Sequence, residues 1–337
     1  MTVHALPKIA EWHDVDSSII ENEIAPLHRP AILKGLLKDW PIVKHAKNSP
    51  AALCEYLTKG SMNKPINFIC SEKQNGRLFY NDAFNGMNFH PQKAGFVDTV
   101  HKILATSKQK NDSAFYIGNA SVKQFTPDIL KDNQNDFLSA DNKASLWIGN
   151  QVTIAPHFDV PDNIACCITG KRRFTLFPPE QISNLYVGPL DFTPAGPPIS
   201  LVDINNPDYH KYPKFKEALK HAQVAELELG DAIYIPSLWW HNVESLEKFN
   251  VLLTYFHDAT PKHYGSGFDC LLHGLMSIRH LPKGKKEGWQ ALFNHYVFSN
   301  EEGMNSHIPE DRWGILGDDS ANISNLIKEK IKKGFIS

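Results

Sequence analysis

The sequence predicts a mainly β protein with added helices, and three observations lead to this fold class. Between residues 114 and 258, short runs of β-branched and aromatic residues alternate with glycine, proline and asparagine, as in strands joined by turns. From residue 261 onward, apolar residues recur at helical spacing. The 337 residues are 42% hydrophobic and 21% charged, which suits a globular protein with one large core. We therefore expect a β-sandwich or barrel at the centre.

The first part of the chain, residues 1–110, predicts a mixed α/β region that packs on the barrel. Residues 30–35 indicate a short strand that ends at a turn glycine. Helices are expected to begin near Asp39 and at Pro50, because proline fits the first turn of a helix, where its missing N–H is not needed.

The central part, residues 111–260, holds the predicted core. Its strands are expected at 115–117, 145–148, 152–154, 164–168, 172–177, 225–229, 232–235 and 250–256. A proline-rich segment, 178–225, interrupts this pattern and is long for a simple loop. We expect it to be a lid or an insertion that faces a substrate.

The last part, residues 261–337, is predicted to be helical. Its apolar positions, among them Phe268, Leu271, Leu275 and Ile278, fall on one helical stripe. Such a stripe either packs on the barrel or forms a homodimer surface, and the sequence leaves both possibilities open.

Bulk composition indicates which partners and compartment to expect. The formal net charge of −2 gives no general electrostatic reason to expect nucleic acid or an anionic membrane as partner. No stretch approaches 18 uninterrupted apolar residues, and the N-terminus lacks the pattern of a signal peptide. The five cysteines, an odd number, do not suggest a disulfide framework. A cytoplasmic protein is therefore expected.

His157, Asp159 and His241 are the candidate metal ligands. Two imidazoles and one carboxylate form the set with which non-heme Fe(II) oxygenases hold iron on one face. In an extended segment, residues i and i+2 point the same way, about 7 Å apart, so His157 and Asp159 can converge on one ion. His241 would then arrive from a neighbouring strand. A His-x-Asp pattern alone also arises about once by chance in a chain of this composition, so the neighbouring residues decide.

Arg172 is a candidate anion-binding residue on the strand that follows. On this strand Arg172 shares a face with Phe174 and Leu176, whereas Lys171 and Arg173 share the opposite face. A cation on the apolar face is costly to bury unless it meets a fixed anion, and the arginine fork suits a carboxylate. That carboxylate could belong to a dicarboxylic cosubstrate or to a structural acid of the protein.

The approach to His241 indicates how the site could exclude water. Residues 229–236 predict a turn followed by an apolar strand, and residues 237–241 are expected to carry that strand to its end at His241. Trp239 and Trp240 would wall off water beside the ligand.

With these residues assembled, the chain resembles the JmjC-type, cupin-like branch of the Fe(II)- and 2-oxoglutarate-dependent oxygenases. Within that branch it is most similar to bacterial cupin-like proteins related to the asparaginyl hydroxylase of hypoxia-inducible factor. The resemblance covers roughly residues 20–260 and rests on the strings 155–159, 170–179 and 230–241 together with Asn163. It implies a double-stranded β-helix, or jelly roll, whose open end holds iron.

The resemblance also implies residue roles and a reaction. Arg172 would grip the distal carboxylate of 2-oxoglutarate, with Lys171 or Arg173 as substitutes if the register is shifted. Asn163, Tyr116 and Thr254 would line the cosubstrate pocket. Fe(II), 2-oxoglutarate and O2 would together hydroxylate a C–H bond and release succinate and CO2. No protein residue beyond the metal ligands is assigned a catalytic role.

Two departures from the family pattern concern the cosubstrate contacts. The related asparaginyl hydroxylase has a threonine three residues before its first histidine, where this chain has Ile154. Near the last strand the relatives tend to have Asn-Tyr-Trp, where this chain has Thr254-Tyr255-Phe256. A threonine hydroxyl can still bind the cosubstrate, although it offers fewer hydrogen bonds than an amide.

Three readings of the function remain open on sequence grounds. The resemblance favours hydroxylation of a protein or peptide side chain, with a small molecule or free amino acid as the alternative substrate. Demethylation of methyl-lysine uses the same first chemical step. A non-catalytic cupin that binds a metal or sugar is a third possibility, but such cupins typically use three histidines and a glutamate, which the Asp159 position does not match.

Overall fold

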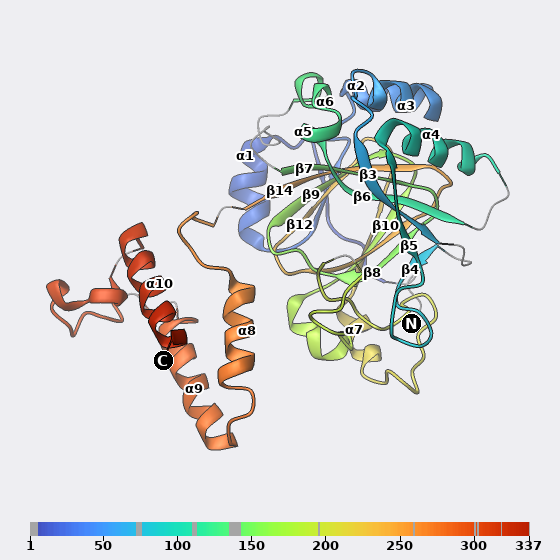
Figure 1. The fold of residues 1–337 in the computed structure, drawn as a ribbon. Coiled ribbons are helices and arrows are strands. Elements are labelled where there is room, and N and C mark those ends of the chain that lie inside the picture. The colour runs from blue at the N-terminus through green and yellow to red at the C-terminus, as the bar shows by residue number, and fades with distance from the viewer. Residues whose placement is uncertain are drawn as a thin grey trace. The chain divides into compact units, whose positions relative to one another are not determined.

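The structure is a computed structural model that describes residues 6–71, 76–109, 113–134, 143–194, 196–258, 260–299, 301, 303–317 and 319–336. The chain divides into two compact units, residues 1–258 and residues 259–337, and each is described by itself. The first unit is built on two β-sheets flanked by helices (Figure 1).

In the described residues of the first unit, fourteen strands form the two sheets. They are β1 (Glu11–His13), β2 (Ala31–Lys34), β3 (Pro65–Ser71), β4 (Arg77–Leu78), β5 (His90–Gly95), β6 (Ala114–Ser121), β7 (Lys143–Gly149), β8 (Thr153–His157), β9 (Asp162–Thr169), β10 (Arg172–Phe177), β11 (Gln223–Leu227), β12 (Ala232–Ile235), β13 (Trp240–Ser245) and β14 (Asn250–His257). The nine-stranded sheet has the order β1-β2-β12-β9-β14-β7-β6-β3-β5, and the five-stranded sheet has the order β11-β10-β13-β8-β4. The strands of residues 6–110 thus belong to the same sheets as the central strands.

The two sheets pack face to face, because side chains of both meet in one apolar cluster. Phe174 and Val243 of the five-stranded sheet lie in this cluster with Ala165, Ile233 and Leu252 of the nine-stranded sheet. Two such sheets, antiparallel except for the β1–β2 and β4–β8 pairs, close around a common interior and form the jelly-roll core that the sequence predicts. The predicted fold class, mainly β with added helices, is therefore confirmed.

Alternation along the strands separates this interior from a second core under the helices. On β9, Ala165 and Cys167 face the interior, whereas Ile164, Cys166 and Ile168 face the other way and pack in a separate cluster with helix residues. A strand that is apolar on both faces must be covered on both faces. This explains why the run 164–168 is uninterrupted by polar residues.

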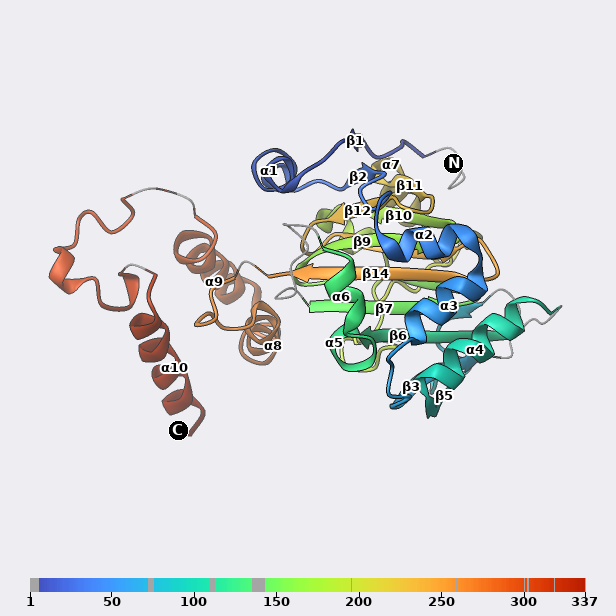
Figure 2. The ribbon, with the colours of Figure 1, turned by 90° about the horizontal axis from the view of Figure 1, so that it is seen from above.

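Helices cover the outer face of the nine-stranded sheet (Figure 2). They are α1 (Ser17–Ile19), α2 (Pro41–Asn48), α3 (Pro50–Thr58), α4 (Phe96–Ser107), α5 (Val122–Phe125) and α6 (Asp128–Asp132), with the short helical turns η2 (Ile20–Ile24) and η3 (Ala25–Leu27). Helix α3 begins at Pro50 as predicted, and the Ser49 hydroxyl caps it by accepting a hydrogen bond from the Ala52 N–H at 3.0 Å.

The segment between β10 and β11 covers the outer face of the five-stranded sheet. It contains the 3-10 helix η4 (Pro179–Asn184) and α7 (Phe215–His221). Leu185, Val202 and Phe215 of this segment pack in one buried cluster with Phe177 and Trp240. The insertion is therefore anchored by its own apolar core.

One strand prediction is wrong. The strand before His241 does not continue to that histidine, because β12 ends at Ile235 and β13 begins at Trp240. The chain turns at Leu238, whose φ of 65° is a left-handed conformation that leucine seldom adopts. His241 therefore lies near the start of a separate strand, which pairs with β8 and β10.

The second unit contains α8 (Gly267–Ser277), α9 (Lys283–Tyr296) and α10 (Ala321–Ile336), with the short turns η5 (Glu310–Arg312) and η6 (Gly314–Leu316). None of the described residues of α8 and α9 is buried, and large apolar side chains such as Met276 and Leu292 are exposed. The homodimer surface expected of these helices stays a prediction. In the parts of the chain that the structure describes, no helix is both long and apolar enough to cross a membrane.

Candidate metal centre and cosubstrate pocket

The fold brings His157, Asp159 and His241 together. His157 ends β8, His241 lies near the start of β13, and the two histidines are direct partners in the antiparallel pairing of these strands. Asp159 follows β8 by two residues, and its Oδ2 lies 3.6 Å from Nε2 of His241. One ligand atom from each residue lies within 4.8 Å of the other two. This spacing suits three ligands on one metal ion.

The backbone fixes which nitrogen each histidine offers. Nδ1 of His157 lies 2.9 Å from the Ala155 carbonyl oxygen, and Nδ1 of His241 lies 3.0 Å from the Trp239 carbonyl oxygen. Because a carbonyl oxygen only accepts hydrogen bonds, each Nδ1 must carry the proton and donate it. Each Nε2 then keeps a free lone pair, which is the arrangement that metal-binding histidines adopt.

Electrostatics favour the neutral, metal-binding form of His241. Burial of the ring and the neighbouring His157 imidazole lower the pKa of His241, while the Asp159 carboxylate opposes this shift. A neutral imidazole can bind a metal near neutral pH without first losing a proton. Two neutral nitrogens and one carboxylate match the ligand set of non-heme Fe(II) oxygenases.

A hydrogen-bond clasp joins the two loops that carry the ligands. The Asp162 carboxylate accepts hydrogen bonds from the Ser237 N–H at 2.7 Å and from the Tyr234 hydroxyl at 2.9 Å. The N–H of Leu238 donates to the Asp159 carbonyl oxygen at 2.9 Å. These contacts hold the loop after β8 against the turn before β13. Asp162 is therefore a positioning residue for the ligand set.

Replacement of Asp162 by alanine is expected to weaken metal binding about tenfold, since loss of an outer partner of a metal site typically costs 10–100-fold in affinity. Titration of the protein with Mn(II) measures this. Tyr234→Phe removes one of the two hydrogen-bond donors to the Asp162 carboxylate and keeps the backbone donor Ser237, so it is the graded control, with a smaller loss. Unchanged affinity in Asp162→Ala would show that the clasp does not position the ligands.

Arg172 is a buried cation, and among the described residues two of its three guanidinium nitrogens have no hydrogen-bond partner. Its side chain is 2% exposed, and its Nε and Nη2 have no hydrogen-bond partner in the structure. Burial lowers the pKa of the guanidinium, and no ion pair to a carboxylate is recorded for it among the described residues. Unpaired buried charges are costly, so this arrangement points to an anion that enters from outside.

The neighbours of Arg172 point elsewhere. Lys171 is exposed and binds Glu228 at 2.9 Å, and Arg173 lies 2.8 Å from Glu226 and 3.8 Å from Glu244. Arg172 lines the cavity of the metal centre, whereas neither of these two residues does. The alternation of side chains along this segment thus separates Arg172, for which the described residues offer no acidic partner, from Lys171 and Arg173, which both have one.

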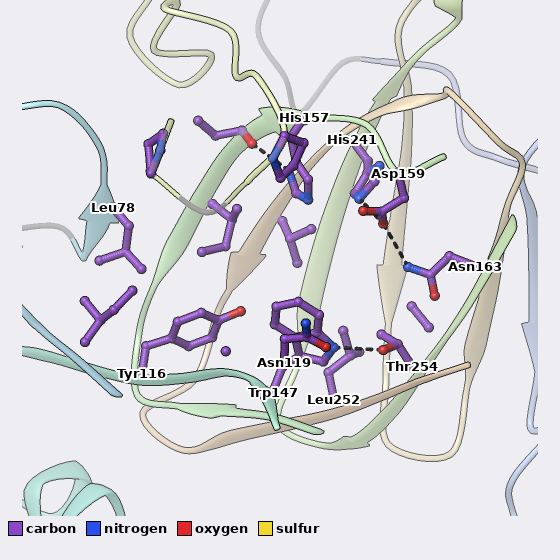
Figure 3. Close-up of a pocket in the computed structure, with 18 of the residues that line it drawn as sticks. Leu78, Tyr116, Asn119, Trp147, His157, Asp159, Asn163, His241, Leu252 and Thr254 are labelled. Atoms are coloured by element: carbon purple, nitrogen blue, oxygen red, sulfur yellow. Dashed lines mark hydrogen bonds and ion pairs between the residues drawn. The ribbon is translucent and has the colours of Figure 1, made fainter. Parts of the chain in front are cut away.

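The other predicted cosubstrate residues line the same cavity, where Figure 3 shows them around the metal ligands. The Asn163 amide donates to Oδ2 of Asp159 at 3.3 Å, and its Oδ1 is buried without a partner. Burial raises the pKa of Tyr116, so its hydroxyl stays protonated, and it lies near enough to Arg172 for electrostatic interaction. The Thr254 hydroxyl accepts a hydrogen bond from Trp147 Nε1 at 2.8 Å.

Several lining residues carry no sequence signal that could have identified them. Trp147 orients the Thr254 hydroxyl, and Leu78 and Phe89 come from a region with no recognisable motif. Ile154, the departure from the family threonine, lines the cavity with hydrocarbon, so the cosubstrate would find one hydroxyl fewer there. Ile154 could be identified as a cavity residue only by comparison with the family, which has a threonine at this position.

The cavity has a volume of about 520 Å³ and reaches from the metal ligands to Arg172. In the pairing of β10 with β13, Leu176 lies opposite the metal ligand His241, and Arg172 lies opposite Ser245. The backbone positions of Arg172 and of the residue opposite His241 are therefore four residues apart, about 13 Å along the strand. The insertion after β10 contributes Pro194, Pro197 and Ile199 to the wall, in agreement with a substrate-facing segment.

A jelly roll that carries two imidazoles and a carboxylate beside an apolar cavity is the arrangement of a cupin with a candidate metal site. The family model described as a cupin-like domain matches residues 17–263. The chain therefore belongs to this family, and its relatives place it in the JmjC-type branch, whose members are typically 2-oxoglutarate-dependent oxygenases.

Three relatives illustrate the range of the branch. JmjC domain-containing protein D of Dictyostelium discoideum is 29% identical over 254 residues, which are 68% of this chain and 51% of that protein. tRNA wybutosine-synthesizing protein 5 of Danio rerio is 24% identical over 280 residues, 75% of this chain and 76% of that protein. Lysine-specific demethylase JMJ31 of Arabidopsis thaliana is 25% identical over 206 residues, 59% of this chain and 34% of that protein. The chain thus spans about half of the Dictyostelium protein.

Proposed function

We propose that this protein is an Fe(II)- and 2-oxoglutarate-dependent dioxygenase that hydroxylates a C–H bond of a protein or peptide side chain. The buried, unpaired Arg172 carries the proposal, because it lies in the same cavity as the three metal ligands. A ligand that binds Arg172 through a carboxylate at one end and the metal through its other end would be an elongated dicarboxylate such as 2-oxoglutarate.

The residues of the cavity would have different roles in this reaction. His157, Asp159 and His241 would hold the iron, which when bound couples decarboxylation of 2-oxoglutarate to oxidation of the substrate. Arg172 would bind the distal carboxylate, and the Tyr116 hydroxyl, which burial keeps protonated, would donate to the same group. Succinate and CO2 are the expected products of the cosubstrate.

The protein environment restricts water rather than supplying acid or base. Phe174, Val243 and Leu252 line the cavity between the ligands and Arg172. A dry, apolar wall strengthens the ion pair at Arg172 and protects reactive species from water. We therefore assign no nucleophile or general base to this chain.

Other substrates define the alternatives. The demethylase and tRNA-modifying relatives act, by their names, on lysine and tRNA, and a small molecule or free amino acid is a further candidate. The expectation that nucleic acid is not a partner rests only on the net charge of −2 and stays a prediction.

The test is turnover of 2-oxoglutarate with fractionated lysate. With Fe(II) and O2, we expect succinate formation and a gain of one oxygen atom in a protein fraction, detected by mass spectrometry. Treatment of the lysate with protease should remove the stimulation, whereas treatment with ribonuclease should leave it. Binding of neither 2-oxoglutarate nor its unreactive analogue N-oxalylglycine to the Mn(II)-loaded protein would refute the proposed function.

A further inference from the structure

The cavity extends to both sides of the metal ligands. In the order β11-β10-β13-β8-β4, the two histidines lie on the middle strands β13 and β8. Arg172 lies on β10 at one side of this pair, and Leu78 lies on β4 at the other. Figure 3 shows Leu78 across the cavity from Asn163. A dicarboxylate that spans from the metal to Arg172 fills only one side.

We call the two sides the arginine arm and the apolar arm. The arginine arm is lined by Asn163, Ala165, Arg172, Phe174, Leu252 and Thr254. The apolar arm is lined by Asn67, Phe68, Ile69, Leu78, Phe89, Pro91, Tyr116 and Ile199. Apart from the Asn67 amide and the Tyr116 hydroxyl, the lining side chains of the apolar arm contain only carbon and hydrogen.

The unsatisfied polar atoms of the cavity lie in the arginine arm. Among the described lining residues, buried side-chain atoms without a partner belong to Asn163 and Arg172. The other lining lysine or arginine is Lys143, which is exposed at the start of β7. A charged group in the apolar arm would lose water and, among the described lining residues of the arm, would meet only the uncharged Asn67 amide and Tyr116 hydroxyl. A hydrocarbon group, by contrast, gains about 25 cal/mol for each Å² that it buries.

The wall of the apolar arm is held in place by hydrogen bonds to the insertion. The Ser200 N–H donates to the Pro156 carbonyl oxygen at 2.7 Å, beside the first metal ligand. The Tyr80 hydroxyl donates to the Phe192 carbonyl oxygen at 2.6 Å. These bonds place Ile199, which is 3% exposed, in a preformed wall. The arm is therefore built before a substrate arrives.

An extended peptide has a place to bind next to this arm. Strand β5, which contributes Pro91 to the arm, is the outermost strand of the nine-stranded sheet and pairs only with β3 among the described strands. Its other edge can accept an added strand, a common mode of peptide recognition. Alternate side chains of such a peptide point toward the sheet faces, so one can enter the apolar arm.

We propose that the apolar arm binds an aliphatic or aromatic side chain of a peptide substrate, and that the C–H bond to be hydroxylated belongs to that side chain. This inference rests on the proposed function and adds its substrate class. It separates the protein from a lysine demethylase, because a methylated ammonium group would find no anion in this arm apart from the metal ligand Asp159.

The experiment uses the full chain loaded with Fe(II) and short blocked peptides, acetyl-Gly-Ser-X-Ser-Gly-amide. With X as leucine or phenylalanine, we expect succinate formation above the peptide-free rate by about tenfold or more, and one added oxygen on X. With X as aspartate or lysine, we expect no stimulation. A short RNA oligonucleotide is tested in parallel and is also expected to be inactive.

Two variants change the preference instead of removing activity. Ile199→Ala enlarges the arm and should shift the preference from the leucine toward the phenylalanine peptide by about tenfold, since pocket methylenes are worth about 1–3 kcal/mol. Leu78→Asp places an anion in the arm, so the variant should prefer the lysine peptide to the leucine peptide. Because a misfolded variant cannot gain activity on a new substrate, turnover of the lysine peptide would also show that this variant is folded. Leu272→Asp, exposed in the second unit, is the control with unchanged preference.

The outcomes separate this inference from the proposed function. If N-oxalylglycine binds the Mn(II)-loaded protein but the leucine and phenylalanine peptides do not stimulate turnover, the substrate class is wrong and the proposed function stands. Stimulation by the aspartate peptide, the lysine peptide or the RNA in their place would overturn the inference in the same way. If N-oxalylglycine does not bind, both the proposed function and the inference about the substrate class are refuted.

Discussion

Replacement of Asp159 by alanine is expected to abolish succinate formation from 2-oxoglutarate. Asp159 is the only carboxylate in the described cavity wall, and its Oδ2 lies 3.6 Å from the Nε2 of His241. Without it, two neutral imidazoles remain, and they supply no charge to balance a divalent cation. We expect turnover to fall below detection and the protein to be purified with little iron, measured by succinate assay and by metal analysis.

A matched substitution distinguishes loss of the site from a general effect of removing an aspartate. Asp39 is exposed in the turn before α2, and Asp39→Ala should retain both iron and turnover. Asp159 is half-buried and near the surface of the cavity, so its loss should change the melting temperature of the metal-free protein little. Normal turnover in Asp159→Ala would remove the metal assignment on which the other site proposals depend.

Strands that bury one or both faces could be predicted from the sequence. The runs 164–168, 172–177 and 250–256 correspond to β9, β10 and β14, because each is bounded by turn residues and packed on both faces. Strand β5 (His90–Gly95) was not predicted. It is a polar edge strand with a proline and no alternation, so nothing in the sequence distinguishes it from a loop.

The turn before His241 could not be predicted for a different reason. Turn signals depend on glycine, asparagine or proline at positions of positive φ, but here Leu238 adopts the left-handed conformation. Its N–H donates to the Asp159 carbonyl oxygen, and the adjacent Ser237 N–H donates to Asp162. Contacts with a segment far away in sequence hold this conformation, and they include the loop that carries a metal ligand.

Those site residues that lie on one strand could be distinguished from their neighbours by the sequence alone. Strand parity alone distinguishes Arg172 from Lys171 and Arg173, and the structure gives the latter two acidic partners on β11, β13 or the loop after β11. The apolar arm was not predictable, because it combines β3, β4, the segment before β5 and the insertion. No motif links segments that meet only in the folded chain.

Arg172→Met should raise the KM for 2-oxoglutarate on the order of 100-fold. Truncation of one partner of a buried, hydrogen-bonded charge pair costs about 2–5 kcal/mol, and 1.4 kcal/mol corresponds to a factor of ten. Methionine fills much of the same volume with an unbranched apolar chain, so the shape of the cavity is largely kept. The KM is measured from succinate formation at increasing cosubstrate concentration.

The same substitution should stabilise the cosubstrate-free protein, and this sign is the sharper part of the prediction. Arg172 is 2% exposed, two of its nitrogens lack partners, and burial lowers the pKa of its guanidinium. Replacement of an uncompensated buried charge by an apolar side chain removes its desolvation penalty. We expect the melting temperature without cosubstrate to rise, while the stabilisation by added 2-oxoglutarate, present in the wild type through ligand linkage, is lost.

Arg173→Met provides the opposite pattern on the same strand. Arg173 already binds Glu226 at 2.8 Å and lies 3.8 Å from the buried Glu244, so its loss leaves Glu244 with a weaker set of partners. We expect a lower melting temperature and an unchanged KM. A normal KM in Arg172→Met together with a raised KM in Arg173→Met would move the carboxylate-binding role to the other face of β10. A lowered melting temperature in Arg172→Met would instead show that the guanidinium serves the fold, because a guanidinium that stabilises the empty protein must have favourable interactions there without the cosubstrate.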